Sequence, residues 1–326
     1  MKKALILHSP VSPDAPDDEQ DTMEQVREVS AELDAMGFDT VSLAFSLNME
    51  LVRNQLLEQR PDFVFNLVES VDGQDRFIIL APALLESMGI PFTGSGSRAV
   101  MGTTCKTAAK GLMLASGIDT PPWVEQGGEA RGGPVFPGTF IVKSVWDHAS
   151  VGLDQDSVVQ AGSRDRLAEA IGQKVRMYGR EFFAEGFIDG REFNISIIDG
   201  DAGPEVLPPA EIRFQESAGM AHRIVDYSAK WRGNSKEYIG TPRSFDFPPD
   251  DGPLLSRLAG VSLECRRLFG MAGYARVDFR VDGAGVPWVL EVNANPCLTT
   301  DSGFIAAALR GGLDYSGVIR RIVGGI

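Results

Sequence analysis

The sequence reads Arg-Val-Asp at residues 276–278 and Val-Leu-Glu-Val-Asn-Ala-Asn-Pro at residues 289–296, and these two stretches decide the fold. Their alternation of apolar and polar residues predicts one strand over residues 273–281 and a second over residues 286–292. The Asp-Gly pair at residues 282–283 is typical of a hairpin turn. We therefore expect the two strands to pair antiparallel, in a sheet with one face covered.

Three oxygen-bearing side chains lie on this expected hairpin. Glu291 and Asn293 are two residues apart and face the same side of their strand, and antiparallel pairing brings Asp278 opposite them. Two carboxylates and an amide are hard oxygen donors, of the kind that hold Mg²⁺ together with substrate phosphates. The alternative is a polar strand face exposed to solvent, which the flanking Val289 and Val292 make the weaker interpretation. The hairpin therefore predicts a magnesium site.

The N-terminal part of the chain alternates short apolar strands with amphipathic helices. We expect strands at residues 4–7, 40–43, 63–67 and 90–92 and helices at residues 21–36, 47–59, 76–88 and 104–116. Such alternation predicts a parallel sheet with helices on both faces. Further along the chain we expect a helix at residues 164–178 and strands at residues 181–187, 192–199 and 205–207. The sequence thus predicts an α/β fold that becomes α+β in its C-terminal half.

Composition and charge limit the classes of protein that the chain can be. Its 326 residues suggest two or three domains. The formal net charge is −14, which argues against nucleic acid as a partner, because phosphate backbones repel an acidic chain. The separated Cys105, Cys265 and Cys297 predict neither a disulfide framework nor a structural zinc site. No apolar run approaches the roughly 20 residues of a membrane span, so we expect a cytoplasmic protein without a membrane partner.

Phosphate binding in so acidic a chain requires local positive charge. Lys106 follows a turn, Lys143 ends a strand, and Lys230 lies in a long, glycine-bearing segment at residues 222–242. Each lysine alone is most simply a surface residue. Lys143, however, precedes a loop of small residues at 149–152, whose N–H groups can close over phosphates. Together with the metal site, the lysines favour a phosphorylated ligand.

Two further motifs permit more than one interpretation. Gly-x-Gly-x-x-Ala at residues 94–99 matches a dinucleotide fingerprint, but it follows the fourth expected strand rather than the first. A glycine-rich turn that opens a helix is therefore favoured. Residues 185–193 place Glu185 and Glu192 around a turn, where backbone groups and a carboxylate can bind adenine and ribose. By itself this stretch is an ordinary acidic hairpin.

Taken together, these motifs resemble the ATP-grasp superfamily and, within it, the D-alanine–D-alanine ligase family. The resemblance spans nearly the whole chain and is strongest in four stretches, residues 92–96, 143–152, 185–193 and 276–302. It implies an ATP-grasp fold in three parts, which are an N-terminal Rossmann-like domain at residues 1–95, a central subdomain at residues 96–180 and a C-terminal subdomain at residues 181–326. It also implies ATP and two Mg²⁺ ions, with Mn²⁺ as an alternative, and small carboxylate and amine substrates, and it leaves a homodimer open.

The resemblance implies a role for each residue that matches the family's motifs. For ATP, the implied contacts are Lys106, Lys143 and Ser150 with the phosphates, Glu185 and the Ile188 backbone with adenine, and Glu192 with the ribose. For the metal ions, the implied ligands are Asp278, Glu291 and Asn293. For the reaction, they are Lys230 at the terminal phosphate from a mobile lid, Arg276 and the Cys297 backbone N–H at the oxyanion, and Ser302 at the carboxylate of the second substrate.

The implied reaction forms an amide in two steps. A carboxylate attacks the γ-phosphate of ATP to give an acyl phosphate, and an amine then displaces phosphate. Metals and cations around the transferring group supply most of the catalysis. The alternatives are an ATP-grasp protein that binds nucleotide or a partner without turnover and, more remotely, a dinucleotide-dependent oxidoreductase. Intact metal ligands together with Arg276 argue against the first alternative.

The first-substrate half of the family pattern is changed in this chain. The family's Gly-Gly-x-Ser-x-Glu is replaced by His-Ser-Pro-Val-Ser-Pro at residues 8–13, and its later His-Gly by Asn-Leu-Val-Glu-Ser at residues 66–70. Ala149 and Trp231 stand where the family has a serine and a tyrosine. We therefore expect an acyl donor other than D-alanine, bound beside Trp231. The candidates to bind the substrate amine are Asp17, Asp18, Glu19 and Glu69.

Overall fold

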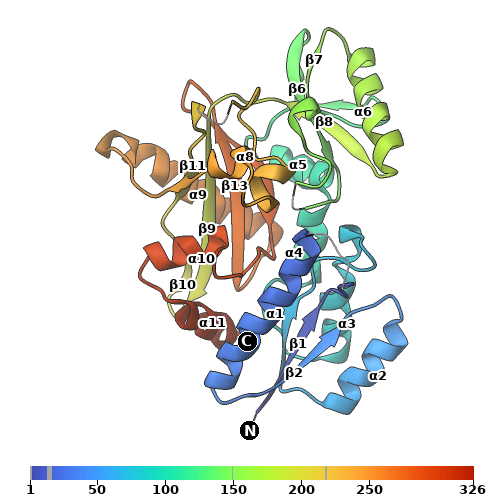
Figure 1. The fold of residues 1–326 in the computed structure, drawn as a ribbon, viewed down its shortest axis with the longest axis vertical. Helices are drawn as coiled ribbons and strands as arrows, with labels where there is room; N and C mark the ends of the chain where they lie inside the picture. Colours follow the sequence, from blue (N-terminus) through green and yellow to red (C-terminus); the bar gives the residue numbers. More distant parts are fainter. Residues whose placement is uncertain (1, 13–16, 149, 217–218) are drawn as a thin grey trace.

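The N-terminal part of the chain is a three-stranded parallel sheet with helices packed against it (Figure 1). The computed structural model describes residues 2–12, 17–148, 150–216 and 219–326, apart from the side chains of residues 17–19. The elements are β1 (Lys3–His8), α1 (Asp17–Ala35), β2 (Asp39–Ala44), α2 (Met49–Gln59), β3 (Phe63–Leu67), η1 (Asp75–Phe77) and α3 (Leu80–Met88), with strand order β2-β1-β3. The predicted parallel sheet is confirmed. Its expected fourth strand is reduced to a single bridge between Val64 and Phe92.

Two helices follow where the sequence predicts one. They are α4 (Ser97–Thr104) and α5 (Lys106–Ala115), and Gly96 of the glycine-rich turn is the N-cap of α4. Cys105 lies between them with an extended backbone, at φ −81° and ψ 104°. This break places Lys106 at the first position of α5, where its side chain is buried.

The central lobe is an antiparallel sheet covered by α6 (Arg164–Tyr178), in strand order β5-β4-β8-β6-β7 (Figure 1). Its remaining elements are β4 (Trp123–Val124), β5 (Ala130–Arg131), β6 (Gly138–Ser144), η2 (Gln155–Ser157), β7 (Val158–Ala161) and β8 (Phe182–Gly186). Phe140, Leu167 and Phe182 are buried in a core formed by the lobe alone.

The C-terminal part is a second antiparallel sheet, as predicted, in order β12-β11-β9-β13-β14, with β10 paired to β9. Its strands are β9 (Arg191–Gly200), β10 (Gly203–Val206), β11 (Ala210–Ile212), β12 (Arg243–Ser244), β13 (Tyr274–Val281) and β14 (Pro287–Asn293). Its helices are α7 (Tyr227–Trp231), α8 (Lys236–Ile239), η4 (Pro249–Asp251), α9 (Gly252–Phe269), α10 (Gly303–Arg310) and α11 (Tyr315–Gly324). No helix in the described ranges is long and apolar enough to cross a membrane.

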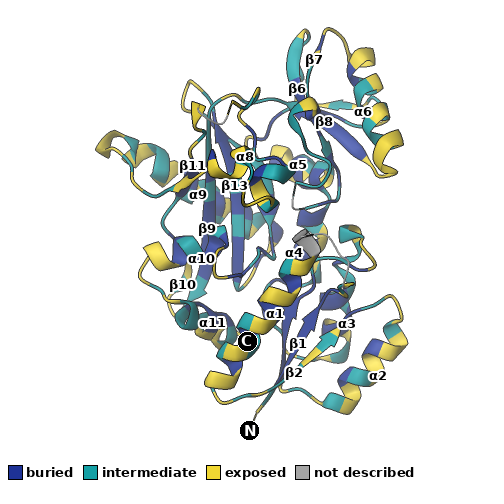
Figure 2. Ribbon diagram, in the orientation of Figure 1, coloured by how far each residue is buried: buried dark blue, intermediate teal, exposed yellow. Residues whose placement is uncertain are grey.

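One hydrophobic core joins the N-terminal sheet to the C-terminal part. Leu33 of α1 and Phe65 of β3 are buried in the same cluster as Tyr274, Phe304 and Ile319. β1, β9 and β13 are inner strands of their sheets, and most of their residues are buried or half-buried (Figure 2). The domain ranges 1–95, 96–180 and 181–326 stay predictions.

Candidate active site

A cavity of about 820 Å³ lies between the central lobe and the C-terminal sheet. It is lined by every predicted site residue whose side chain is described, namely Glu69, Lys106, Lys143, Ser150, Glu185, Ile188, Glu192, Lys230, Trp231, Arg276, Asp278, Glu291, Asn293, Cys297 and Ser302. Asp17, Asp18 and Glu19 lie outside the described side chains, and Ala149 outside the described residues. The fold thus gathers the predicted residues in one place, and their individual roles stay predictions.

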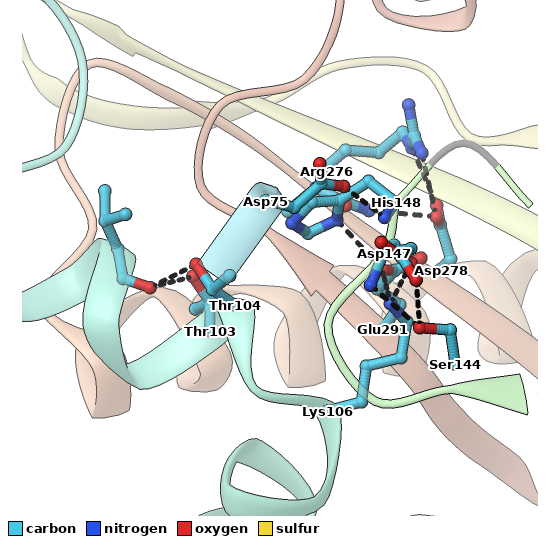
Figure 3. Close-up of polar contacts among 12 residues, drawn as sticks. Asp75, Thr103, Thr104, Lys106, Ser144, Asp147, His148, Arg276, Asp278 and Glu291 are labelled. Carbon is cyan, nitrogen blue, oxygen red and sulfur yellow. Dashed lines mark hydrogen bonds and ion pairs between the residues drawn. The ribbon is translucent and has the colours of Figure 1, made fainter. Parts of the chain in front are cut away.

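The β13–β14 hairpin presents the expected carboxylates. Asp278 pairs with Glu291 and Arg276 with Asn293 in the antiparallel register, which is irregular just after Asp278. Asp278 accepts hydrogen bonds from Arg276 at 2.8 and 2.9 Å (Figure 3). It also accepts hydrogen bonds from Asn194 Nδ2 at 2.7 Å and from Asn293 Nδ2 at 3.1 Å. Burial opposes the charge on Arg276, but Asp278 outweighs it and raises the pKa of the guanidinium. The sequence did not indicate Asn194, which β9 places opposite Asp278.

Glu291 is held from the other side of the cavity. Lys106 Nζ lies 3.1 Å and His148 Nδ1 3.3 Å from Glu291 Oε1 (Figure 3). Burial works against the charged carboxylate, but Lys106 and His148 together hold the pKa of Glu291 well below its usual value. Lys106 Nζ also donates to the Asp147 carbonyl at 2.6 Å, and the His148 backbone N–H donates to Asp75 Oδ2 at 2.7 Å. This network joins η1, α5, the loop after β6 and the hairpin.

The donor set of the hairpin fits a hard cation. Asp278 and Glu291 are directly paired, their side chains are 13% and 23% exposed, and Asn293 lines the same cavity. Within the described residues, no three His, Cys, Asp or Glu side chains converge as a metal site. An ion here would therefore complete its shell with the Asn293 amide, substrate phosphates or water, which is the usual habit of Mg²⁺.

Glu185, expected at adenine, lies between two lysines. Its Oε2 is 2.7 Å from Lys110 Nζ and its Oε1 is 2.6 Å from Lys143 Nζ. Burial alone would raise the pKa of Glu185, but the two ammonium groups lower it. Lys110 also donates to Thr120 Oγ1 at 2.7 Å, and burial lowers its pKa. Lys110 does not line the cavity but holds Glu185 from behind, and the sequence did not indicate this role, although Lys110 lies four positions after Lys106 and so shares its helix face.

Glu192, expected at the ribose, is paired with a buried arginine. Arg280 Nη2 lies 2.9 Å from Glu192 Oε2, and the same guanidinium donates to the carbonyls of Gly190, at 3.0 Å, and Arg223. Burial raises the pKa of Glu192 even though Arg280 opposes the shift. A Cβ at position 190 would lie 2.0 Å from the Val281 carbonyl oxygen, so only glycine permits this close approach.

The end of the cavity nearest the N-terminal sheet carries two carboxylates. Glu69 accepts a hydrogen bond from Gln25 Nε2 at 2.9 Å, and burial raises its pKa to about 7. Asp21 accepts a hydrogen bond from the thiol of Cys297 at 3.1 Å, and burial raises its pKa as well. Asp21 is a second residue that the sequence analysis missed. Its spacing of four from Gln25 on α1 places both on one helix face.

The segment at residues 222–242 lines one side of the cavity. Lys230 Nζ lies 5.3 Å from the ring centre of Trp231, and burial, aided by the charge of Arg276, lowers the pKa of Lys230. Ser150 has a positive φ of 61°, and its hydroxyl donates to the Val225 carbonyl at 3.0 Å. The expected phosphate-loop serine is thereby joined to this segment.

Ser302 is the N-cap of α10. Its hydroxyl oxygen accepts a hydrogen bond from the Ile305 backbone N–H at 3.3 Å, which leaves the hydroxyl hydrogen available to an acceptor. The positive end of the helix dipole lies at the same place and favours an anion. The arrangement suits the carboxylate that Ser302 is expected to contact.

The chain is similar to the proteins of one family in sequence and in fold. The sequence profile described as D-ala D-ala ligase C-terminus matches residues 123–324. The chain belongs to the D-alanine–D-alanine ligase family. This family member is 32% identical to the y4sG protein of Sinorhizobium fredii, over 82% of this chain and 75% of that protein. It is 29% identical to the D-alanine–D-alanine ligase of Moorella thermoacetica, over 99% of this chain and 98% of that protein.

The fold of this D-alanine–D-alanine ligase family member is that of solved ligases. The crystal structure of the D-alanine–D-alanine ligase from Bacillus anthracis complexed with ATP has a TM-score of 0.73 and 24% identity, over 100% of this chain and 97% of that one. The predicted ATP-grasp fold with an N-terminal parallel sheet is confirmed.

Proposed function

We propose that the protein is an ATP-dependent ligase that joins a small carboxylate to an amine through an acyl phosphate. The polar face of the β13–β14 hairpin supports this most directly, because Asp278, Glu291 and Asn293 stand beside Arg276 in a cavity that also contains Lys106. A protein that only binds nucleotide has no need of a partly buried arginine next to its metal ligands. Membership of a ligase family supports the same reaction.

In the first step, a donor carboxylate oxygen attacks the γ-phosphorus of ATP, the bond to the bridging oxygen breaks, and ADP leaves. Lys106 and Lys143 contact the phosphates, and Lys230 contacts the group being transferred. Mg²⁺ bound by the hairpin supplies further neutralisation of the phosphate charge. Glu291 now pairs with Lys106, and Glu185 pairs with Lys143. Both ion pairs must break before the two lysines can contact the nucleotide.

In the second step, the amine nitrogen attacks the acyl carbon, phosphate leaves, and the nitrogen loses a proton. Arg276 stabilises the tetrahedral oxyanion together with the Cys297 backbone N–H. Asp278 orients the Arg276 guanidinium beforehand through hydrogen bonds of 2.8 and 2.9 Å. Ser302 and the first turn of α10 bind the carboxylate of the acceptor.

The donor in this proposal is larger than D-alanine. Trp231 adds apolar surface next to Lys230. The end of the cavity at Glu69 adjoins a second cavity of about 480 Å³, which is bordered also by Tyr178 and Tyr227. A longer donor can extend into that space while Glu69 or Asp21 binds its ammonium group.

A substrate screen tests the proposal. The purified chain is incubated with ATP, Mg²⁺ and pairs of amino acids and small carboxylates, and phosphate release and product mass are measured. We expect ADP, phosphate and an amide in equal amounts for at least one pair. ATP binding without phosphate release from any pair would instead support a nucleotide-binding protein without turnover.

A further inference from the structure

Arg243 lines the cavity but has no part in the proposed reaction. It is the first residue of β12, where its backbone pairs with Ile212 of β11. Its Nη1 donates to the Asp301 carbonyl oxygen at 3.0 Å, and it forms no ion pair with any carboxylate that the structure describes. Arg243 is therefore an exposed cation at the cavity wall that has no carboxylate partner among the described residues.

The guanidinium of Arg243 lies against the first turn of α10. A Cβ on Gly303 would be 3.3 Å from Arg243 Nε, 3.6 Å from Cζ and 3.8 Å from Nη2, so the guanidinium packs against this glycine. Asp301, whose carbonyl it contacts, and Gly303 are the two neighbours of Ser302 in the chain. Arg243 is thus adjacent to the hydroxyl that is expected to bind the acceptor's carboxylate.

The electrostatic surroundings of Arg243 favour an incoming anion. Arg243 is exposed to solvent at the cavity wall, and the charges of Arg276, Tyr238 and Asp301 act on its guanidinium. Arg276 is neutralised by both oxygens of Asp278, whereas Arg243 is not neutralised in this way. A guanidinium has five N–H donors in a fixed fork that fits a carboxylate. The Asp301 carbonyl uses one of them.

An ordinary amino-acid acceptor has one carboxylate, for which Ser302 and the N-terminus of α10 suffice. We infer that the acceptor carries a second acidic group, which Arg243 binds, so that the acceptor is a dicarboxylic amino acid or an amine of the same charge. This inference rests on the proposed function, because it assigns the acceptor of that reaction. Because Gly303 has no side chain, the Arg243 guanidinium can lie close to the first turn of α10.

Direct binding tests the inference without turnover. Calorimetric titrations with glutamate and glutamine, and with aspartate and asparagine, in both enantiomers, are made on the purified chain with ADP and Mg²⁺. At least one acid should bind about 10- to 100-fold more tightly than its amide, which is the ratio expected for charge-assisted hydrogen bonds. Arg243→Gln should abolish this ratio, and Arg243→Lys should retain part of it. The matched control is Arg310→Gln, at the far end of α10, where Arg310 pairs with Asp246 on the surface.

Three results overturn the inference. They are equal affinity of the unsubstituted chain for each acid and its amide, an unchanged ratio in Arg243→Gln, and a uniform loss for acids and amides alike. The last would show that Arg243 binds the carboxylate common to all amino acids. Failure of the proposed reaction is a separate observation, because it appears as no phosphate release with any acceptor. Unfolding midpoints of each variant verify that the chain is folded.

Discussion

Replacement of Lys110 by methionine tests how much the buried ion pair between Lys110 and Glu185 stabilises the fold. Lys110 Nζ lies 2.7 Å from Glu185 Oε2 and 2.7 Å from Thr120 Oγ1, and its side chain is 1% exposed. Methionine keeps the length but removes the charge, so Glu185 retains only Lys143. Removing one partner of a buried ion pair costs about 3–5 kcal/mol. We expect about 3 kcal/mol, the low end of that range, because Lys143 still neutralises one carboxylate oxygen.

Thermal unfolding measures this loss. About 3 kcal/mol corresponds to a fall of roughly 4 °C in the midpoint, since the unfolding entropy is about 2 cal/mol/K per residue. Combining Lys110→Met with Glu185→Leu should recover part of the loss, because the charge then left without a partner is that of Lys143, whose side chain is 18% exposed and can be solvated. Arg27→Met is the surface control, since its partner Glu24 is exposed, and it should leave the midpoint unchanged. A Lys110→Met midpoint equal to that of the unsubstituted chain, or a double variant that loses as much as both single variants together, would refute the reasoning.

Four further predictions concern the site. Glu291→Gln or Asn293→Ala should lower kcat at least about 100-fold at saturating Mg²⁺ without changing the fold, since metal ligands support several kcal/mol of charge stabilisation. Near-normal turnover would contradict the metal assignment. Burial raises the pKa of Glu69 from 4.5 to about 7, so the folded chain holds this proton where the unfolded chain releases it. Stability should therefore decrease from pH 4.5 to 7 and level off above. Denaturant unfolding of Glu69→Gln should lack a component of this decrease on the order of 3 kcal/mol, and parallel curves would argue against the assignment. Residues 222–242 should become resistant to protease when an ATP analogue and Mg²⁺ are added, and equal cleavage with and without them would argue against a lid. D-Alanine should release phosphate more slowly than the best donor in a panel at matched concentration, and D-alanine as the best donor would restore the ordinary activity of the family.

The hairpin at the centre of the site could be predicted because its information is local. A period of two and a turn signal predict that the two strands pair antiparallel, and the structure has this hairpin. The exact pairing of Asp278 with Glu291 depends on a register shift just after Asp278, because a regular ladder from the turn would place Leu290 opposite Asp278. Short elements were missed for the opposite reason. β4 and β12 have two residues each, too few to show any period, and are fixed by their neighbours in the sheet. The helix expected from residue 76 begins at Leu80 instead, which puts Pro82 in its first turn, where a missing N–H costs no hydrogen bond.

The partners of the site residues could not be predicted because they come from remote parts of the chain. Asn194 reaches Asp278 only because β9 pairs with β13. Arg280 reaches Glu192 across the same pair of strands, at 2.9 Å. Asp21 approaches Cys297 because α1 packs against the C-terminal part, which no local pattern indicates. Residue types at a site follow from its chemistry, whereas their counter-ions follow from the tertiary fold.

The core that α1 shares with α10 and α11 determines which part of the molecule can change position. Close-packed layers cannot slide without opening voids, so the N-terminal and C-terminal parts must behave as one rigid body. The central lobe has its own core and can rotate as a cover, with Gly186 hydrogen-bonded to the Pro122 carbonyl at 2.8 Å near its connection. Asp21 and Ser302 both belong to this body, so in the proposed reaction these two residues keep a constant separation when the lobe moves. Tyr178 of the lobe borders the space proposed for a longer donor, so movement of the lobe would change the donor end of the site and leave the acceptor end at Ser302 unchanged.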